Sequence, residues 1–185
     1  YTRSTALITS VEEARYYGGA FDQFQTLYGA APGDMSTASS NWTSASNGDG
    51  NGLIRAVSNN NAELFYAFNH LYYAQLITGY YSGAAGSGGS SHAIIGQNIP
   101  SSAVDNVGYL FNHPNDAAGV VAAGDSVYFE GTYSHVLILA GMITGDTSTP
   151  SRVYMTTKEA YELDAKYDDG NPGQGWVLTP EMSTL

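Results

Sequence analysis

The chain has 185 residues, no cysteine and a formal net charge of −11, from six Lys and Arg against seventeen Asp and Glu. A single domain of this length can bury about 70% of its unfolded surface without a disulfide, and the lack of cysteine excludes disulfide scaffolds, thiolate zinc sites, iron–sulfur clusters and cysteine nucleophiles. The negative charge argues against nucleic acid and anionic membrane surfaces as partners.

The N-terminal segment predicts one long amphipathic helix that ends near residue 28. Its apolar residues follow one another in steps of three or four, which places them on a single face. They are Leu7, Val11, Ala14, Tyr17, Phe21, Phe24 and Tyr28. Gly29 is suited to cap this helix, and Pro32 with Gly33 prevents its continuation. Such an apolar stripe is typical of an ordinary helix that faces the core of its own domain. The alternative is that it is the exposed end of a longer helix through which subunits assemble.

The next segment predicts a loop and a second helix. Residues 33–61 are rich in Ser, Thr, Asn, Gly and Asp, which is typical of a loop. Asn60 is a good N-cap, and Glu63 three residues later can complete a capping-box-like pair. The helix is expected to end at Gly79, and its broad apolar face comprises Leu64, Phe65, Phe68, Leu71, Tyr72, Leu76 and Ile77. Residues 82–91 then read as a low-complexity linker or surface loop.

Short strands are expected in the second half of the chain. The apolar pattern predicts them at residues 104–111, 126–129 and 136–143, with Gly, Asn and Asp between them. Residues 130–133 suit a hairpin connection, and residues 176–178 suit a short final strand.

A third helix is predicted between the last two of these strands. Thr156 and Glu159 form a capping box at its start, and Gly170 with Pro172 ends it. A helix followed by strands, with no βαβ repetition, predicts an α+β fold. We expect one domain over residues 1–185, with a long N-terminal helix packed on an antiparallel sheet and additional short helices.

Two oxygen-rich turns are candidate calcium sites. In the first, Asn47, Asp49 and Asn51 alternate with glycines that let the backbone curl, so that the side-chain oxygens can converge on an ion. No Glu follows at the position that an EF-hand requires. The candidate ligands of the second turn are Asp164, Asp168 and Asp169. Because Asp, Asn and Gly are also good turn formers, plain turns are the alternative at both places, and any calcium would be structural.

No motif of the chain indicates an enzyme. The four histidines lack metal-binding spacing, and neither a GxSxG elbow nor a P-loop lysine is present. We therefore expect no catalysis and no required cofactor, and a hydrolase that uses Asp168 and Asp169 is the weak alternative. Tyrosine pairs at 16–17, 72–73 and 80–81 suit core packing, glycan stacking or contacts between subunits.

Composition also bears on location. No run of 18 apolar residues and no signal peptide is seen, so neither a membrane-spanning helix nor a leader is expected. Only 12% of residues are charged, about half of the usual ~25%. Ser, Thr, Asn, Gly and Tyr supply the polar surface instead, which favours a location outside the cell.

Several motifs occur in an order that a known family shares. The first is Phe21-x-x-Phe24-x-x-x-Tyr28-x-x-x-Pro32-Gly33-Asp34-Met35, followed by Gly48-Asp49-Gly50-Asn51-Gly52. Then come Glu63, His70-Leu71, Ala74-x-Leu76-Ile77-x-Gly79-Tyr80 and Ile99-Pro100. The last is Ala160-x-x-Leu163-Asp164-Ala165-Lys166-x-Asp168-Asp169-Gly170-x-Pro172-x-x-Gly175. Over residues 12–177 the chain resembles bacterial type IV pilins and pseudopilins, which carry a prepilin-type cleavage and methylation segment.

The resemblance implies a pilin-like domain with a helix at residues 1–28 and a globular head at residues 29–185. It implies a subunit of a helical filament, extracellular or at the cell surface, whose partners are copies of itself and minor pilins. In that family an apolar segment upstream anchors the precursor in the membrane and then forms the filament core. This sequence begins at Tyr1 without that segment, so any membrane contact would depend on it, and the C-terminal disulfide of many pilins is also absent.

Two functions from different classes follow. The leading hypothesis is a structural subunit of a type IV pilus-like or pseudopilus filament, since head-to-tail contacts that do not close build open filaments. Surfaces rich in Tyr and Asn suit such contacts, because they lose less hydration on burial than charged ones. The alternative is a secreted glycan-binding module whose loops are ordered by calcium.

Overall fold

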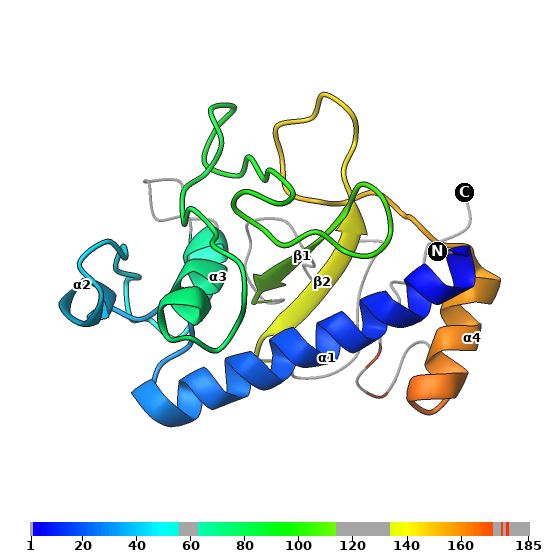
Figure 1. The fold of residues 1–185 in the computed structure, drawn as a ribbon, viewed down its shortest axis with the longest axis horizontal. Coiled ribbons are helices and arrows are strands. Elements are labelled where there is room, and N and C mark those ends of the chain that lie inside the picture. The colour runs from blue at the N-terminus through cyan, green and yellow to red at the C-terminus, as the bar shows by residue number, and fades with distance from the viewer. Residues whose placement is uncertain (1, 56–62, 114–133, 172–174, 176, 178–185) are drawn as a thin grey trace.

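The computed structural model describes residues 2–55, 63–113, 134–171, 175 and 177. Its elements, in chain order, are α1 (Arg3–Tyr28), α2 (Ala38–Asn41), α3 (Glu63–Tyr73), β1 (Val107–Asn112), β2 (Val136–Gly141) and α4 (Thr157–Tyr167). β1 and β2 form an antiparallel pair, and α1 runs past them along one side of the molecule (Figure 1). This arrangement is the α+β class that the sequence predicts.

α1 is a helix of 26 residues that begins four residues before the predicted apolar stripe. The Thr2 hydroxyl oxygen accepts the N–H of Thr5 and caps the start, while Gly29 ends the helix in the left-handed conformation, at φ +68°, as predicted. Within the stripe, the buried members are Leu7, Tyr17, Phe21 and Phe24, and the half-buried ones are Val11, Ala14 and Tyr28. Neither α1 nor any other described helix combines the length and the apolarity that a bilayer crossing needs.

The segment that follows α1 contains a short helix where the sequence predicts only loop. α2 is one turn long, and Ala38 at its start is fully buried. No apolar period marks this turn, and its Ser and Asn residues favour caps and turns over helix interiors. Trp42, directly after it, contacts the rings of Phe24 and Tyr28, so α2 ties the loop to the end of α1.

α3 is the second predicted helix, but it is shorter than expected. It runs from Glu63 to Tyr73 and does not extend to Gly79. Asn60, its expected N-cap, lies outside the described residues. Nine of its eleven residues are buried, which agrees with the broad apolar face of the sequence.

A turn after α3 explains why the apolar pattern in the sequence continues beyond the last residue of the helix. Gln75 takes a left-handed conformation with φ +60°, which interrupts the helical backbone. The N–H of Leu76 then donates to the carbonyl of Leu71, five residues back, and the ladder of helical hydrogen bonds stops. Ile77 nevertheless reaches the core, so its burial is achieved by a turn and not by a further helical turn.

The sheet matches two of the predicted strands. β1 and β2, six residues each, pair along their whole length, at the places where residues 104–111 and 136–143 predict strands. β1 begins later than predicted because Asn106 has φ +58°, a turn conformation that precedes the extended backbone. Outside the described residues lie the expected strand at 126–129, the hairpin at 130–133 and most of the final strand at 176–178.

Aromatic side chains join α1, α3 and β1 in one core. The ring of Phe111 in β1 lies 4.9 Å from that of Phe21 in α1 and 5.1 Å from that of Phe68 in α3, between centroids. Tyr17 of α1 packs edge-on against Phe68. Burying one such side chain stabilises the fold by about 1.5–3 kcal/mol, so these rings fix the helix to the sheet.

A buried hydrogen bond sets the position of α1 along the sheet. The hydroxyl of Tyr109, a fully buried residue of β1, lies 2.7 Å from a carboxylate oxygen of Glu13 and 2.8 Å from the carbonyl oxygen of Ser10, and its proton is shared between them. A buried hydroxyl needs such a partner, so α1 has one favoured register against β1.

α4 packs beside the N-terminal half of α1 through polar contacts (Figure 1). Its start is the capping box that the sequence predicts, with Thr156 and Glu159 each accepting a main-chain N–H from the other. The Glu159 carboxylate also pairs with the Arg3 guanidinium of α1. A second arginine, Arg15, donates to the carbonyl of Tyr167 at 3.2 Å and stacks over its ring.

Candidate metal centres

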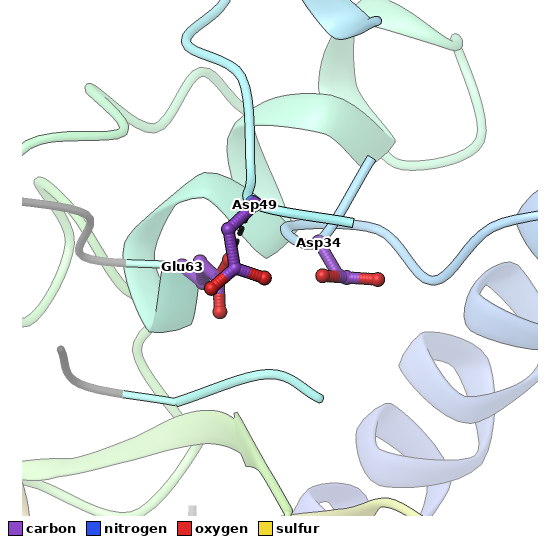
Figure 2. Close-up of side chains that lie close together, drawn as sticks. All are labelled: Asp34, Asp49 and Glu63. Carbon is purple, nitrogen blue, oxygen red and sulfur yellow. Dashed lines mark hydrogen bonds between the residues drawn. The ribbon is translucent and has the colours of Figure 1, made fainter. Parts of the chain in front are cut away.

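The first acidic group consists of Asp34, Asp49 and Glu63, which three separate segments bring together (Figure 2). Asp34 follows α1, Asp49 lies in the glycine-rich loop, and Glu63 is the first residue of α3. One carboxylate oxygen from each lies within 4.8 Å of the other two. Asp34 and Glu63 are buried, whereas Asp49 is exposed.

Glycines make this convergence possible. Gly33 has φ +96°, and a Cβ on it would collide with main-chain atoms at the start of α3. Gly48 passes so close to the backbone of residues 33 and 34 that no larger residue fits there. The glycine before Asp34 therefore allows its loop to lie against the start of α3, and the glycine before Asp49 allows the two loops to touch.

Main-chain N–H groups occupy the oxygens of both buried carboxylates. The two oxygens of Asp34 accept from the N–H of Asn51 and of Gly52, both at 3.0 Å. Those of Glu63 accept from the N–H of Asp49 at 2.9 Å and of Arg55 at 3.3 Å. The two carboxylates thus hold the glycine-rich loop in shape without any added ligand.

Burial raises the pKa of both carboxyl groups in spite of these hydrogen bonds. The pKa of Glu63 rises to about 7, because removal from water penalises its charge and Asp49 adds repulsion. The pKa of Asp34 is raised by burial too, and the N–H groups of Gly52 and Asn51 oppose the rise. Near neutral pH, Glu63 is therefore poised between its charged and neutral forms.

Only one of the three residues predicted for the first site belongs to this group. Asp49 does, whereas the side-chain oxygen of Asn47 accepts from the N–H of Ser39 at 2.8 Å. The side-chain oxygen of Asn51 accepts from the N–H of Leu53 at 2.8 Å, and its amide nitrogen donates to Asp49. The side-chain oxygen of Asn51 thus closes a local turn, whereas that of Asn47 contacts the main chain of α2, eight residues earlier.

Asp34 and Glu63 are site residues that the sequence does not assign. Each carries a recognisable signal: Asp34 follows a Pro-Gly pair, and Glu63 is an acidic residue at the head of an apolar helix. These signals indicate a turn and a helix start, but not that the two side chains meet. Their meeting is a property of the tertiary fold.

The second acidic group is the predicted set Asp164, Asp168 and Asp169, at the C-terminal end of α4. The structure brings all three together, again with one oxygen of each within 4.8 Å of the others. Main-chain groups orient two of them: Asp168 accepts from the N–H of Val177 at 2.9 Å and Asp169 from that of Asn171 at 2.7 Å. Neither side-chain oxygen of Asp164 has a hydrogen-bond partner, although the residue is fully buried.

Fully buried His70 has a structural role beside the first group. Its Nδ1 accepts the N–H of Gly33 at 2.9 Å, so Nε2 must carry the proton and donate to the carbonyl of Ser46 at 2.8 Å. Burial lowers the pKa of His70 to about 4, which keeps the ring neutral in this role. With both nitrogens engaged, the ring has no free lone pair for a metal.

A shallow cleft of about 330 Å³ lies next to the first group. Its lining includes Asp34, Gly50 and Gly52 from the loops, Gln25 from α1 and His135 before β2. Burial and the neighbouring His113 lower the pKa of His135 to about 4, so this imidazole is neutral near pH 7. The cleft gives water access to Asp34 from the α1 side.

Comparisons with known proteins do not assign the chain to a family. Neither family models, nor curated proteins, nor solved structures give a match. The pilin-like resemblance thus remains a prediction from the ordered motifs.

Proposed function

We propose that the chain is a structural subunit of an extracellular filament of the type IV pilus or pseudopilus kind. The observation that carries the proposal is α1, a helix of 26 residues whose apolar stripe is packed on its own head while Leu27, outside that stripe, is exposed at 59%. The ordered motifs of the sequence support the same role. In this role the chain is not a catalyst, and its partners are copies of itself.

We assign one face of α1 to packing within its own chain and the opposite face to contacts between copies. The predicted assembly residues, from Leu7 to Tyr28, face inward and fasten the helix to the head of the same chain. The opposite face carries the exposed apolar side chain of Leu27. This outer face is the surface that we assign to contacts between copies.

Low charge favours repeated burial of such a surface. The outer face of α1 has polar uncharged residues near its C-terminal end, among them Gln23 and Thr26. Uncharged groups lose less hydration than ions when they enter an interface. An exposed helix face that meets a different face of the next copy gives a contact that repeats without closing.

Structural calcium fits the subunit as a stabiliser and not as a cofactor. Both acidic groups offer carboxylate oxygens, which calcium prefers, and neither includes a sulfur or imidazole ligand. An ion bound there would neutralise part of the net charge of −11 and hold a loop in place. It would take no part in a reaction.

Thiol crosslinking tests the filament role, because the chain has no cysteine of its own. Leu27→Cys places a single thiol on the outer face of α1. In surface filaments isolated from the producing cells, a short bis-maleimide should link copies of this variant into dimers. The unassembled variant at equal concentration is the control, and it should stay monomeric. If mass spectrometry finds the chain missing from the filament fraction, the proposal fails.

Glycan binding is supported less well by the arrangement of the tyrosines. Tyr80 is exposed at 57%, but its ring meets that of Tyr72 edge to face, at 82° between planes. A sugar stacks best on a flat aromatic platform, which this pair does not form. Calorimetric titration with polysaccharides, with and without a chelator, separates this alternative from the filament role.

A further inference from the structure

The cleft beside Asp34 lies at the C-terminal end of α1 and has a volume of about 330 Å³. Sites for small molecules have volumes of roughly 300–1,000 Å³. Its lining comes from the last turn of α1, the loop that follows, the glycine-rich loop and His135 before β2. The cleft is therefore large enough for a small organic molecule, and its walls come from segments that are distant in sequence.

The end of α1 gives the cleft partial negative charge. The last carbonyl groups of a helix have no partner within the helix, and they form the negative end of its dipole. No main-chain N–H of the described residues donates to the carbonyl of Gly29 or Ala30, and both residues line the cleft. The last turn of α1 contains no basic residue that could balance this charge. A cation is the kind of ligand that this helix end favours.

Asp34 adds a full negative charge to the lining. The residue is only 3% exposed, and it lies on the side of the first acidic group that faces α1 (Figure 2). Its two oxygens accept the N–H of Asn51 and of Gly52, so neither oxygen needs a proton of its own. A carboxylate has about four lone-pair sites, so these two donors leave acceptor capacity for a ligand.

No positive charge of the lining residues opposes a cation. The other polar side chains of the lining are Gln25, Ser36 and His135. His135 accepts the N–H of Ile54 through Nε2 at 3.3 Å, and an imidazole that accepts a hydrogen bond is neutral. Burial and His113 lower the pKa of His135 to about 4, which agrees with the neutral form. Among the described lining residues, the only full charge is therefore negative.

We propose that this cleft binds a small primary ammonium ion, with Asp34 and the carbonyl groups at the end of α1 as hydrogen-bond acceptors. The proposal is independent of the filament role. An ammonium group has three N–H donors and no acceptor, so it suits a site whose acceptors are a carboxylate and main-chain carbonyls. The alkyl part of the ligand would contact Ala30 and Ala31, which also line the cleft. A metal ion has no such apolar part.

Titration of the ¹⁵N-labelled chain with butylammonium chloride tests the proposal, in chelating buffer at pH 7.5 with 150 mM sodium chloride. The amide signals of Gly29, Gly50 and Gly52, which line the cleft, should shift and saturate with a Kd of about 1 mM or lower. 1-Butanol has the same alkyl chain without the charge, and tetramethylammonium has the charge without N–H donors. Each control should bind about tenfold more weakly or not at all.

Two glutamines of α1 provide a matched pair of variants. Gln25→Lys places an ammonium group of the protein at the cleft, so butylammonium should bind about tenfold more weakly or less. Gln23→Lys makes the same change at a position of α1 that does not line the cleft, and its Kd should stay within about twofold of the wild-type value. Both positions are exposed and lysine is a good helix former, so both variants should fold.

Asp34→Asn removes the charge of the site and should also weaken binding about tenfold. Because Asp34 is buried, the two lysine variants keep the test decisive if this third variant does not fold. The proposal is overturned by shifts that do not saturate up to about 20 mM butylammonium, or by equal binding of either control compound. Equal affinity in Gln25→Lys and Gln23→Lys, an unchanged Kd in folded Asp34→Asn, or saturable shifts confined to residues 164–169 would overturn it as well.

Discussion

Glu63 gives the fold a pH-dependent component. In the folded chain its pKa is about 7, against an ordinary value of 4.5, because it is buried. Between these values the folded chain holds a proton that the unfolded chain releases. The resulting stabilisation is fully present below pH 4.5 and is lost as the pH rises through about 7. A shift of this size corresponds to roughly 3 kcal/mol.

We expect Glu63→Gln to remove this component. Urea unfolding in chelating buffer at several pH values between 4.5 and 8 gives the free energy of unfolding of both proteins. The wild-type value minus the variant value should fall by about 3 kcal/mol over that range. Burial lowers the pKa of His70 and of His135 to about 4, which acts in the opposite direction but equally in both proteins.

The control is Glu162→Gln, a change at an exposed carboxylate of α4. Its stability should run parallel to that of the wild type across the same pH range. If the curve of Glu63→Gln is also parallel, Glu63 titrates normally and the argument from burial is wrong.

For individual residues, the sequence predicts that they share a site only when they lie close together in the chain. Asp164, Asp168 and Asp169 can be recognised as one group because four or five residues on a helix end make one turn. The first group draws Asp34, Asp49 and Glu63 from three segments, and only the tertiary fold joins them. When residues from distant segments form one site, the sequence shows which of them could bind a metal. It does not show which of them lie together in the fold.

At the scale of the elements, α4 relies on its cap, since only two of its eleven residues are buried. The hydroxyl oxygen of Thr156 accepts the N–H of Glu159 at 3.2 Å. We expect Thr156→Ala to lower the free energy of unfolding by about 1 kcal/mol, measured by urea or thermal unfolding. Thr157→Ala, one position into the helix, is the matched control and should be neutral or slightly stabilising. An equal loss in both variants would mean that the cap is not the cause.

The ends of the helices also show which boundaries can be predicted from a few neighbouring residues and which cannot. The start of α4 at Thr156 and the end of α1 at Gly29 each depend on a few neighbouring residues, and the sequence predicts both. The end of α3 is not, because the left-handed turn at Gln75 allows Ile77 to enter the core, and an apolar pattern does not distinguish a turn from a continued helix. The one-turn helix at 38–41 has no period to reveal it.

For the whole molecule, net charge opposes assembly. Copies that each carry −11 repel one another at low ionic strength, and salt screens this repulsion over about 10 Å at 0.1 M. We expect sedimentation velocity to show more self-association in 500 mM than in 20 mM sodium chloride. Leu27→Glu, on the outer face of α1, should reduce association at both concentrations. Association that weakens as salt rises would indicate that ion pairs, and not uncharged surfaces, join the copies.

The hydrogen bond between Tyr109 and Ser10 spans 99 residues of chain. α1 leaves the ribosome before β1, the strand that covers its aromatic face, because β1 is made much later. At 5–20 residues per second, that face waits for about 5–20 s during synthesis before its partner exists. During this interval α1 is an uncovered amphipathic helix, available to chaperones or to neighbouring nascent chains. The order of translation thus gives the helix a period of exposure that the folded molecule no longer has.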